Sequence, residues 1–246
     1  MISGRGAVTT AVILAGGMGT RLSSVVPNLP KPLAPINGRP FLEHQMDYWM
    51  AQGVNRFILS VGYRREQIMA HFGTSYQGCE VSYAEETTPL GTGGGLLLAM
   101  EKLREEKQFF VLNGDTFFEV EVSALIHFHQ TMEAALSVAL FDVTANDRYM
   151  GVQVGANGAI SSFRSEPGAS QLANGGVYLF NRELFKHMPW TTGDRVSLED
   201  DLFTHFLSSG KRLYGMVFQG RFIDIGVPAD YSRASDIIDH IHGTLR

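Results

Sequence analysis

The sequence predicts an α/β fold with a mostly parallel central sheet and helices on both of its faces. Residues 10–15, 57–61 and 108–112 form short, continuous apolar runs, which are typical of parallel strands buried on both faces. Segments with helical spacing of apolar residues separate these runs, and strands that alternate with helices favour a parallel sheet. The chain has 246 residues, of which 44% are hydrophobic, and this supplies the core of one such unit.

The elements of the first half alternate regularly. We expect strands at 10–15, 57–61, 80–84 and 108–112, and helices at 40–52, 64–72, 94–103 and 122–132. The second half is richer in β-structure, with strands expected at 136–141, 152–154, 160–163, 176–180, 213–218 and 221–225. A helix is expected at 197–207, where Ser197 is a suitable N-cap, and a closing helix at 228–241.

Composition excludes several classes of protein. The net charge is −5 and there is no basic run, which argues against a nucleic-acid partner. The single cysteine, Cys79, excludes a disulfide framework and a cysteine-based zinc site, and the eight histidines show no metal-ligand spacing. No run reaches the roughly 18 apolar residues of a membrane span, and the N-terminus lacks a signal-peptide core. We therefore expect a cytoplasmic protein without a membrane partner, and the sequence leaves a homo-oligomer open.

A glycine-rich loop follows the first strand directly. Residues 14–22 read Leu-Ala-Gly-Gly-Met-Gly-Thr-Arg-Leu, and such glycines let backbone N–H groups turn toward a phosphate. The loop lacks the third glycine of the dinucleotide fingerprint, and it lacks the Gly-Lys-Ser/Thr of the P-loop, so neither motif fits well. Arg21 in this loop and Lys31, which lies between two prolines, could together neutralise a polyphosphate. The alternative is that both are solvated loop side chains.

Two carboxylates are candidate ligands of Mg²⁺. Asp115 follows the strand at 108–112, and ligands of open α/β sheets bind at the carboxyl ends of parallel strands. Asp224 lies between apolar residues and needs a partner if it is buried. Mg²⁺ takes one or two carboxylates together with phosphate oxygens, which suits this pair. For Asp224 the alternative is a helix cap.

Together these segments resemble the signature motifs of the sugar-1-phosphate nucleotidyltransferases. The resemblance covers residues 14–22, Pro30-Lys31-Pro32 and 89–94, then Asn113-Gly114-Asp115, 174–178 and 224–226, in that family's order. It runs from about residue 10 to residue 231. The subgroup most similar is that of the D-glycero-α-D-manno-heptose 1-phosphate guanylyltransferases, followed by mannose-1-phosphate guanylyltransferases.

The resemblance implies a Rossmann-like nucleotidyltransferase fold, Mg²⁺, and the reaction of an NTP with a sugar 1-phosphate to give an NDP-sugar and pyrophosphate. The expected product is GDP-heptose for a bacterial surface polysaccharide. The chain would be a single domain (1–246) with a nucleotide-binding half (about 10–120), a sugar-binding half (about 121–231) and a closing helix (228–242). No room remains for a second enzymatic domain, so we expect one activity.

The resemblance also implies roles for individual residues. Arg21 and Lys31 would be catalytic, and Asp115 and Asp224 would hold Mg²⁺. Nucleotide-binding positions would be Leu14, Ala15, Gly16, Gly17, Gly19, Thr20, Glu86, Gly91 and Thr92. Sugar-binding positions would be Asn113, Tyr149, Arg164, Asn174, Gly175 and Glu199. No general base is needed, because a sugar phosphate is already ionised; alignment and charge neutralisation at the α-phosphorus suffice.

One pair of acids bears on the choice of base. Glu85 and Glu86 precede the loop at 89–95, where the family binds the base. Guanine offers two adjacent donors, N1–H and the 2-amino group, and a carboxylate accepts from both. Uracil and cytosine offer no such pair. Glu86, or Glu85, therefore favours GTP, and two solvated acids are the alternative.

Two departures from the family pattern concern the sugar. Where relatives commonly have Glu-Lys-Pro, residues 163–167 read Phe-Arg-Ser-Glu-Pro, so Glu166 reverses the charge, and Arg164 is the candidate for a substitute cation. Residues 148–151 read Arg-Tyr-Met-Gly, so Met150 interrupts the Arg-Tyr-Gly that is usual at this place. These departures leave mannose 1-phosphate or another hexose 1-phosphate open as the substrate. The charge reversal at Glu166 also motivates a second hypothesis, a sensor that binds nucleotide-sugar without turnover.

Overall fold

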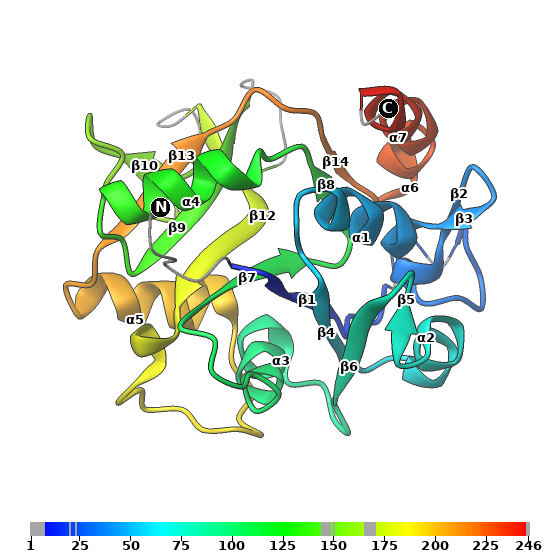
Figure 1. Cartoon of the computed structure of the whole chain (residues 1–246), viewed down its shortest axis with the longest axis horizontal. Coiled ribbons are helices and arrows are strands. Elements are labelled where there is room, and N and C mark those ends of the chain that lie inside the picture. Colours follow the sequence, from blue (N-terminus) through cyan, green and yellow to red (C-terminus); the bar gives the residue numbers. More distant parts are fainter. Residues whose placement is uncertain are drawn as a thin grey trace, which may run out of the picture.

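The computed structural model describes residues 8–19, 21–22, 24–143, 149, 151–164 and 171–244, with 241–244 described by their backbone alone. Its centre is an eight-stranded sheet in the order β13-β9-β12-β7-β1-β4-β6-β5 (Figure 1). In chain order these strands are β1 (Thr10–Ala15), β4 (Arg56–Val61), β5 (Ser75–Tyr76), β6 (Cys79–Glu85), β7 (Gln108–Asn113), β9 (Leu136–Asp142), β12 (Leu172–Asn181) and β13 (Leu213–Val217).

The sheet is mostly parallel, as the sequence predicts. Strands β7, β1, β4 and β6 run parallel to one another, with Val12 of β1 opposite Ile58 on one side and Val111 on the other. β13 and β9 form a second parallel pair. β12 lies between these two blocks and is antiparallel to both β7 and β9. This strand therefore joins the front half of the chain to the back half in one sheet.

Helices cover both faces of the sheet. α1 (Phe41–Ala51), α2 (Arg65–Phe72), α4 (Val122–Thr131) and α7 (Ala234–Thr244) contribute to one hydrophobic cluster, and α3 (Gly91–Met100) and α5 (Phe203–Ser208) to the other. Figure 1 shows α1 and α4 above the sheet and α3 and α5 below it. β1 supplies both clusters alternately: Ile13 belongs to the first and Val12 to the second. This alternation explains why the strand is apolar throughout.

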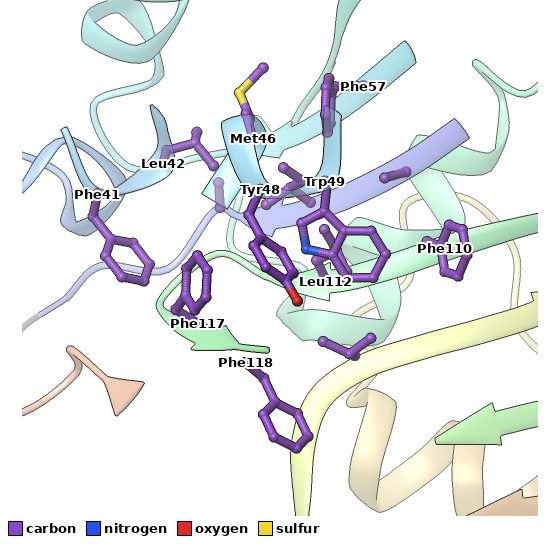
Figure 2. Packing of buried hydrophobic residues seen from close by; sticks show 14 of the residues in the cluster. Phe41, Leu42, Met46, Tyr48, Trp49, Phe57, Phe110, Leu112, Phe117 and Phe118 are labelled. Atoms are coloured by element: carbon purple, nitrogen blue, oxygen red, sulfur yellow. The ribbon is translucent and has the colours of Figure 1, made fainter. Parts of the chain in front are cut away.

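Aromatic side chains fill the first cluster (Figure 2). Trp49 of α1 packs on Phe110 of β7 with ring centroids 5.0 Å apart, and Tyr48 meets Phe117 edge to face at 5.1 Å. Trp49 is 1% exposed, so this helix is fixed against the strand that carries Asn113. Phe117 belongs to β8 (Thr116–Phe118), which pairs with β14 (Phe222–Asp224) in a separate two-stranded sheet.

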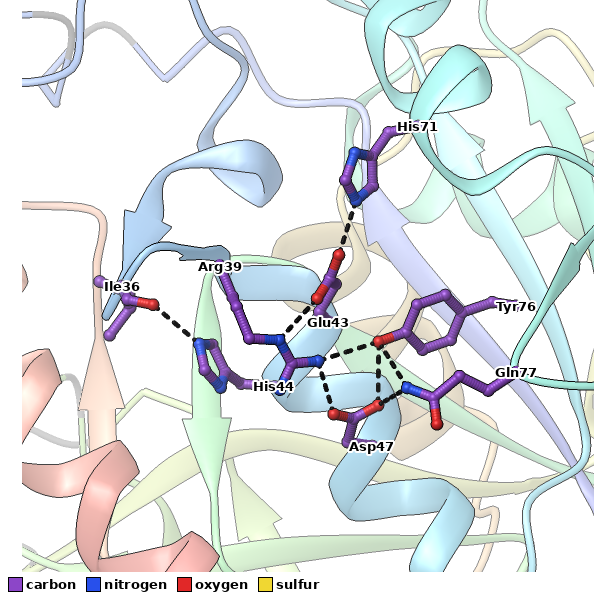
Figure 3. Close-up of polar contacts among 8 residues, drawn as sticks. All are labelled: Ile36, Arg39, Glu43, His44, Asp47, His71, Tyr76 and Gln77. Atoms are coloured by element: carbon purple, nitrogen blue, oxygen red, sulfur yellow. Dashed lines mark hydrogen bonds and ion pairs between the residues drawn. The ribbon is translucent and has the colours of Figure 1, made fainter.

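A polar network holds α1 through Glu43 and Asp47 (Figure 3). Arg39 of β3 (Arg39–Pro40) binds Glu43 at 2.8 Å and Asp47 at 2.7 Å. Asp47 also accepts from the Tyr76 hydroxyl at 3.0 Å. Burial and the neighbouring Asp47 raise the pKa of Tyr76 to about 12, so the phenol stays a donor. The network ties edge strand β5 to α1.

Four expected elements differ from the structure by more than two residues at one end or are divided in two. α3 begins at Gly91 and ends at Met100 instead of spanning 94–103, and the helix expected at 197–207 is a π-helical turn (Leu198–Leu202) followed by α5. The closing helix is divided into α6 (Pro228–Tyr231) and α7. The strand expected at 176–180 begins at Leu172, so Asn174-Gly175-Gly176 lies within β12. The remaining short elements are the 3-10 turns Lys31–Leu33 and Arg182–Phe185 and the strands β2 (Pro35–Ile36), β10 (Gln153–Val154) and β11 (Ile160–Ser162).

The early start of α3 has a tertiary cause. The amides of Gly93 and Gly94 both donate to the Val196 carbonyl, at 2.9 and 3.0 Å. A Cβ on Gly94 would collide with the Asp194 carbonyl, and Gly91 has φ +75°. Glycines are poor helix formers, but here they let segment 194–198 approach the first turn of the helix. No helix among the described residues is long and apolar enough to cross a membrane.

Candidate active site

Two hollows lie along the carboxyl-terminal ends of the central strands. The first, about 320 Å³, is lined by Leu14, Ala15, Gly16, Gly17, Met18, Lys31, Pro32, Ser60, Glu86, Pro89, Gly91, Thr92, Gly95, Asn113, Gly114, Asp115 and Arg195. The second, about 270 Å³, is lined by Arg21, Tyr149, Phe163, Arg164, Asn174, Glu199 and Asp224. Both volumes are at or near the lower end of the range for small-molecule sites. We call them the first and second cavities.

Glu86 is a buried carboxylate in the wall of the first cavity. It is 9% exposed, its Oε1 accepts from the Ser60 hydroxyl at 3.2 Å, and its Oε2 accepts from the Leu90 amide at 3.0 Å. A Cβ on Gly16 would collide with this carboxylate, so the glycine-rich loop can pass over Glu86 only with a glycine at position 16. Among the described residues no cation pairs with Glu86. The described residues leave a lone pair on each oxygen without a hydrogen bond.

The neighbouring Glu85 lies differently. It is exposed at the end of β6 and pairs with Arg65 at 3.4 Å. It does not line the first cavity. Of the two acids that the sequence leaves open as the reader of the base, Glu86 is the one in the cavity wall.

A lysine and two aspartates meet where the two cavities adjoin. Lys31 Nζ lies 2.9 Å from Asp115 Oδ2, and the Gly226 amide donates to Asp224 Oδ1 at 2.6 Å. The position of a Cβ on Gly226 is 2.7 Å from Asp224 Oδ1, 3.1 Å from Lys31 Nζ and 3.6 Å from Asp115 Oδ2. One point in space is thus close to all three groups. In the described part of the chain, no three His, Cys, Asp or Glu side chains gather in a metal-binding group.

The turn that carries Asp115 is held by the core helix. Gln45 of α1 donates from Nε2 to the carbonyls of Asn113 and Thr116, both at 2.9 Å. The Gly114 amide donates to the Leu14 carbonyl at 2.9 Å. These bonds fix the end of β7 against β1. Asp115 is therefore positioned by backbone contacts on both sides.

Thr92 connects the two cavities. It lines the first, its hydroxyl donates to Glu199 Oε2 of the second at 3.1 Å, and it accepts from the Leu198 amide at 2.9 Å. Glu199 lies in the π-helical turn 198–202, a distortion that is common at functional sites. Burial raises the pKa of Glu199. Across this cavity Asn174 donates to the Tyr178 hydroxyl at 2.7 Å, and Arg164 pairs with Asp200.

Comparison with known proteins decides the family, because the nucleotidyl transferase family matches residues 10–240. The chain belongs to this family. It is 38% identical over 232 residues to the D-glycero-alpha-D-manno-heptose 1-phosphate guanylyltransferase of Aneurinibacillus thermoaerophilus, which covers 94% of this chain and 98% of the relative. The Campylobacter jejuni protein of the same name is 37% identical over 222 residues, covering 90% of this chain and 96% of that protein.

A solved crystal structure has the same fold. The crystal structure of HddC from Yersinia pseudotuberculosis complexed with GMP-PN matches with a TM-score of 0.80 and 31% identity, over 93% of this chain and 99% of that one. These findings confirm the family resemblance, the fold class and the assignment as an enzyme of nucleotidyl transfer. The division into a nucleotide-binding and a sugar-binding half stays a prediction.

Most of the expected site residues of this nucleotidyl transferase line one of the two cavities. Those expected at the nucleotide line the first cavity, apart from Gly19, which packs on Lys31, and Thr20, which lies outside the described residues. Those expected at the sugar line the second, except Asn113, which lines the first, and Gly175, which packs against Phe118. Glu166 and Met150 also lie outside the described residues.

Three placements were not foreseen. Arg21 lines the second cavity and Lys31 the first, so the two cations do not share one cavity. Ser60 and Arg195 line the first cavity although nothing singled them out in the sequence. A lone serine in the apolar run 57–61 was an available signal for Ser60. Arg195 had none, since it depends on the packing of segment 194–198 against α3.

Proposed function

We propose that this protein transfers GMP from GTP to D-glycero-α-D-manno-heptose 1-phosphate, giving GDP-heptose and pyrophosphate, with the product used in a bacterial surface polysaccharide. The observation that carries the proposal is the convergence of Lys31, Asp115 and Asp224 where the two cavities adjoin. The first cavity would take GTP and the second the heptose phosphate. The two heptose guanylyltransferases that match nearly the whole chain support this choice of substrates.

The reaction needs positioning and charge neutralisation at one phosphorus. An oxygen of the sugar phosphate forms a bond to the α-phosphorus of GTP, and the bond from that phosphorus to the bridging oxygen of pyrophosphate breaks. Lys31 in the first cavity and Arg21 in the second are cations on either side of that point. No proton has to be removed from the nucleophile. The two cations therefore supply what the transition state requires, without a general base.

The aspartate pair fits Mg²⁺. Asp115 and Asp224 offer hard oxygen donors near one common point beside Gly226. Two protein carboxylates leave the other coordination positions to water and substrate phosphate, which is how Mg²⁺ is held at phosphate-transfer sites. When bound there, the ion would neutralise charge that develops on the phosphates. Lys31 would then share Asp115 with the metal.

Glu86 supports the choice of guanine. Ser60 and Leu90 hold the carboxylate at both oxygens, and each oxygen keeps a free lone pair. Guanine N1–H and its 2-amino group are donors with matching spacing. Adenine offers an acceptor at N1 in place of the donor, and a buried carboxylate rejects such a base.

The second cavity supports a phosphorylated sugar. Glu199, Asn174 and Tyr149 provide acceptors and donors for hydroxyl groups, and Arg21 is a cation without a partner among the described residues. We assign to Arg164 the contact with the sugar phosphate that a lysine makes in relatives. Its guanidinium pairs with Asp200, and both side chains are exposed.

The test is pyrophosphate release in the presence of Mg²⁺, with each common NTP crossed with a panel of sugar 1-phosphates that includes D-glycero-α-D-manno-heptose 1-phosphate. Release with GTP and the heptose phosphate is the expected result. Release with GTP and a hexose phosphate would refute the sugar, and release with UTP, CTP or dTTP would refute the guanine assignment.

The second candidate is a sensor that binds nucleotide-sugar without turnover. The charge reversal at Glu166 favours it. Binding of GDP-sugar with no pyrophosphate release across the whole panel would establish it. In that case Glu166→Lys is the first variant to test for restored turnover.

A further inference from the structure

One cation of the first cavity has no part in the function proposed above. Arg195 lines this cavity and is exposed, and among the described residues it has no ion pair and no hydrogen bond through its side chain. Lys31, the other cation of the cavity, is paired with Asp115. An unpaired guanidinium in the wall of a ligand cavity is a candidate for contact with the ligand.

The backbone beside Arg195 is anchored on both sides. The Val196 amide donates to the Leu90 carbonyl at 2.8 Å, and its carbonyl accepts from Gly93 and Gly94. The Asp194 carboxylate accepts from the Thr191 amide at 2.8 Å and from its hydroxyl at 3.2 Å. Binding through Arg195 thus requires ordering of the side chain alone, which limits the entropic cost.

The anchoring ties the backbone next to Arg195 to the segment that holds Glu86. Leu90 is the shared residue: its carbonyl binds Val196, and its amide binds Glu86 Oε2 at 3.0 Å. The groups around Lys31 Nζ belong to other segments, namely Asp115 after β7 and Gly226 after β14. The segment of Arg195 is therefore linked through Leu90 to Glu86, and it has no such link to the residues around Lys31 Nζ.

We propose that Arg195 is a specificity-determining residue that donates to O6 and N7 of guanine while Glu86 accepts from N1–H and the 2-amino group. An arginine donating to both O6 and N7 is the commonest specific contact with guanine in nucleic-acid recognition. Adenine presents an amino donor at the position of O6, and pyrimidines lack N7. The acid and the arginine together would thus distinguish guanine on two edges. The inference rests on the proposed use of GTP.

The test compares binding of GTP, 7-deaza-GTP, ITP and UTP by calorimetry without any sugar phosphate. 7-Deaza-GTP lacks the N7 acceptor, and ITP lacks the 2-amino group opposite Glu86. The variant Arg195→Met removes the donors and keeps an unbranched side chain. Arg212→Met is the matched control, because it removes an exposed arginine that pairs with Glu133 and lines neither cavity.

Wild-type protein should bind 7-deaza-GTP and ITP each about tenfold more weakly than GTP. In Arg195→Met, GTP should bind about tenfold more weakly, the penalty for 7-deaza-GTP should disappear, and the penalty for ITP should remain. Arg195→Lys keeps a single ammonium donor, so its affinity for GTP and its penalty for 7-deaza-GTP should lie between those of wild type and of Arg195→Met. The Arg212→Met control should behave as wild type. We expect the melting temperature of each variant to be unchanged, because the Arg195 side chain is exposed and unpaired among the described residues. An unchanged melting temperature would exclude a folding defect.

Equal weakening of all nucleotides, UTP included, with the 7-deaza penalty retained, would overturn the inference and assign Arg195 to the phosphates. Absence of a 7-deaza penalty in wild type would overturn it as well. Failure of the proposed function appears separately. Tight GTP binding without pyrophosphate release would refute catalysis and leave the base contact intact, whereas preference for UTP would refute both.

Discussion

The aspartates at the junction of the cavities are the residues on which turnover should depend most. Asp115→Asn and Asp224→Asn each remove a charge that would hold Mg²⁺, while the amide keeps the shape and can still accept the hydrogen bonds. We expect each to lower kcat by about 100-fold or more. Pyrophosphate release at saturating Mg²⁺ measures this. Asp236→Asn on α7, exposed and outside both cavities, is the matched control. Full Mg²⁺-dependent turnover in either cavity variant would refute the metal assignment.

Glu86 should decide between bases rather than drive the chemistry. Glu86→Gln replaces one acceptor oxygen by a donor, which mismatches guanine, so we expect KM for GTP to rise at least about tenfold with a smaller change in kcat. Ser60→Ala leaves the carboxylate in place but removes the bond at 3.2 Å, so a smaller rise of the same kind is expected. Steady-state kinetics with GTP and ITP distinguishes the two. An unchanged ratio of GTP to ITP in Glu86→Gln would exclude Glu86 as the base reader.

At the level of secondary structure, the attachment of α4 should be sensitive to pH through a buried histidine. His129 is 1% exposed, with Nδ1 2.8 Å from the Ser137 hydroxyl of β9 and Nε2 3.3 Å from Asn181 of β12. Burial lowers its pKa below the ordinary value of 6.5. At pH values between the lowered pKa of His129 and 6.5, this histidine binds more protons in the unfolded chain than in the folded one. Stability is therefore complete above pH 7 and falls as pH decreases through this window, by at most about 1.4 kcal/mol per pH unit.

His129→Gln should remove this part of the pH dependence, because glutamine can bond both partners without titrating. Denaturant unfolding at pH 7.5 and pH 5.5 measures the difference. His127→Gln on the same helix is exposed and serves as the control. If His129→Gln lost as much stability on acidification as wild type, another group would be responsible.

The helices also show how far local preference extends. Apolar spacing and the flanking Pro40 and Gly53 located α1 to within a residue or two, because that helix buries one face against β7. The helix expected at 94–103 begins three residues earlier, at Gly91, although glycines such as Gly93, Gly94 and Gly95 are poor helix formers. Contacts to Val196 override that preference, and they depend on a segment about a hundred residues away. Such contacts leave no local periodicity, so the start of α3 and the π-helical turn could not be predicted.

For the whole molecule, a ligand that occupies both cavities should stabilise more than one that occupies the first. GDP-heptose would contact Glu86 in one cavity and Glu199 in the other, and these belong to segments joined through Thr92. We expect a larger rise in melting temperature with GDP-heptose than with GDP at equal concentration, since tighter binding to the folded state adds stability. Thermal unfolding with GDP, GDP-mannose and GDP-heptose measures it. Equal shifts with all three would mean that the sugar makes no net contact.

The sequence by itself determined the fold class, the family and most of the residues that line the two cavities. The fold class and the position of Asp115 followed because buried strands form apolar runs and because the carboxyl ends of parallel strands gather at one edge of the sheet. The family and most of the site residues followed from the resemblance of the motifs to those of the sugar-1-phosphate nucleotidyltransferases. Only the tertiary structure decided which acid of Glu85 and Glu86 enters the cavity, that Arg21 and Lys31 serve different cavities, and that Arg195 joins the first. The physical reason is that these outcomes depend on how distant segments pack, with Gly16 over Glu86 and Val196 on Leu90. No residue carries that information in its own neighbourhood.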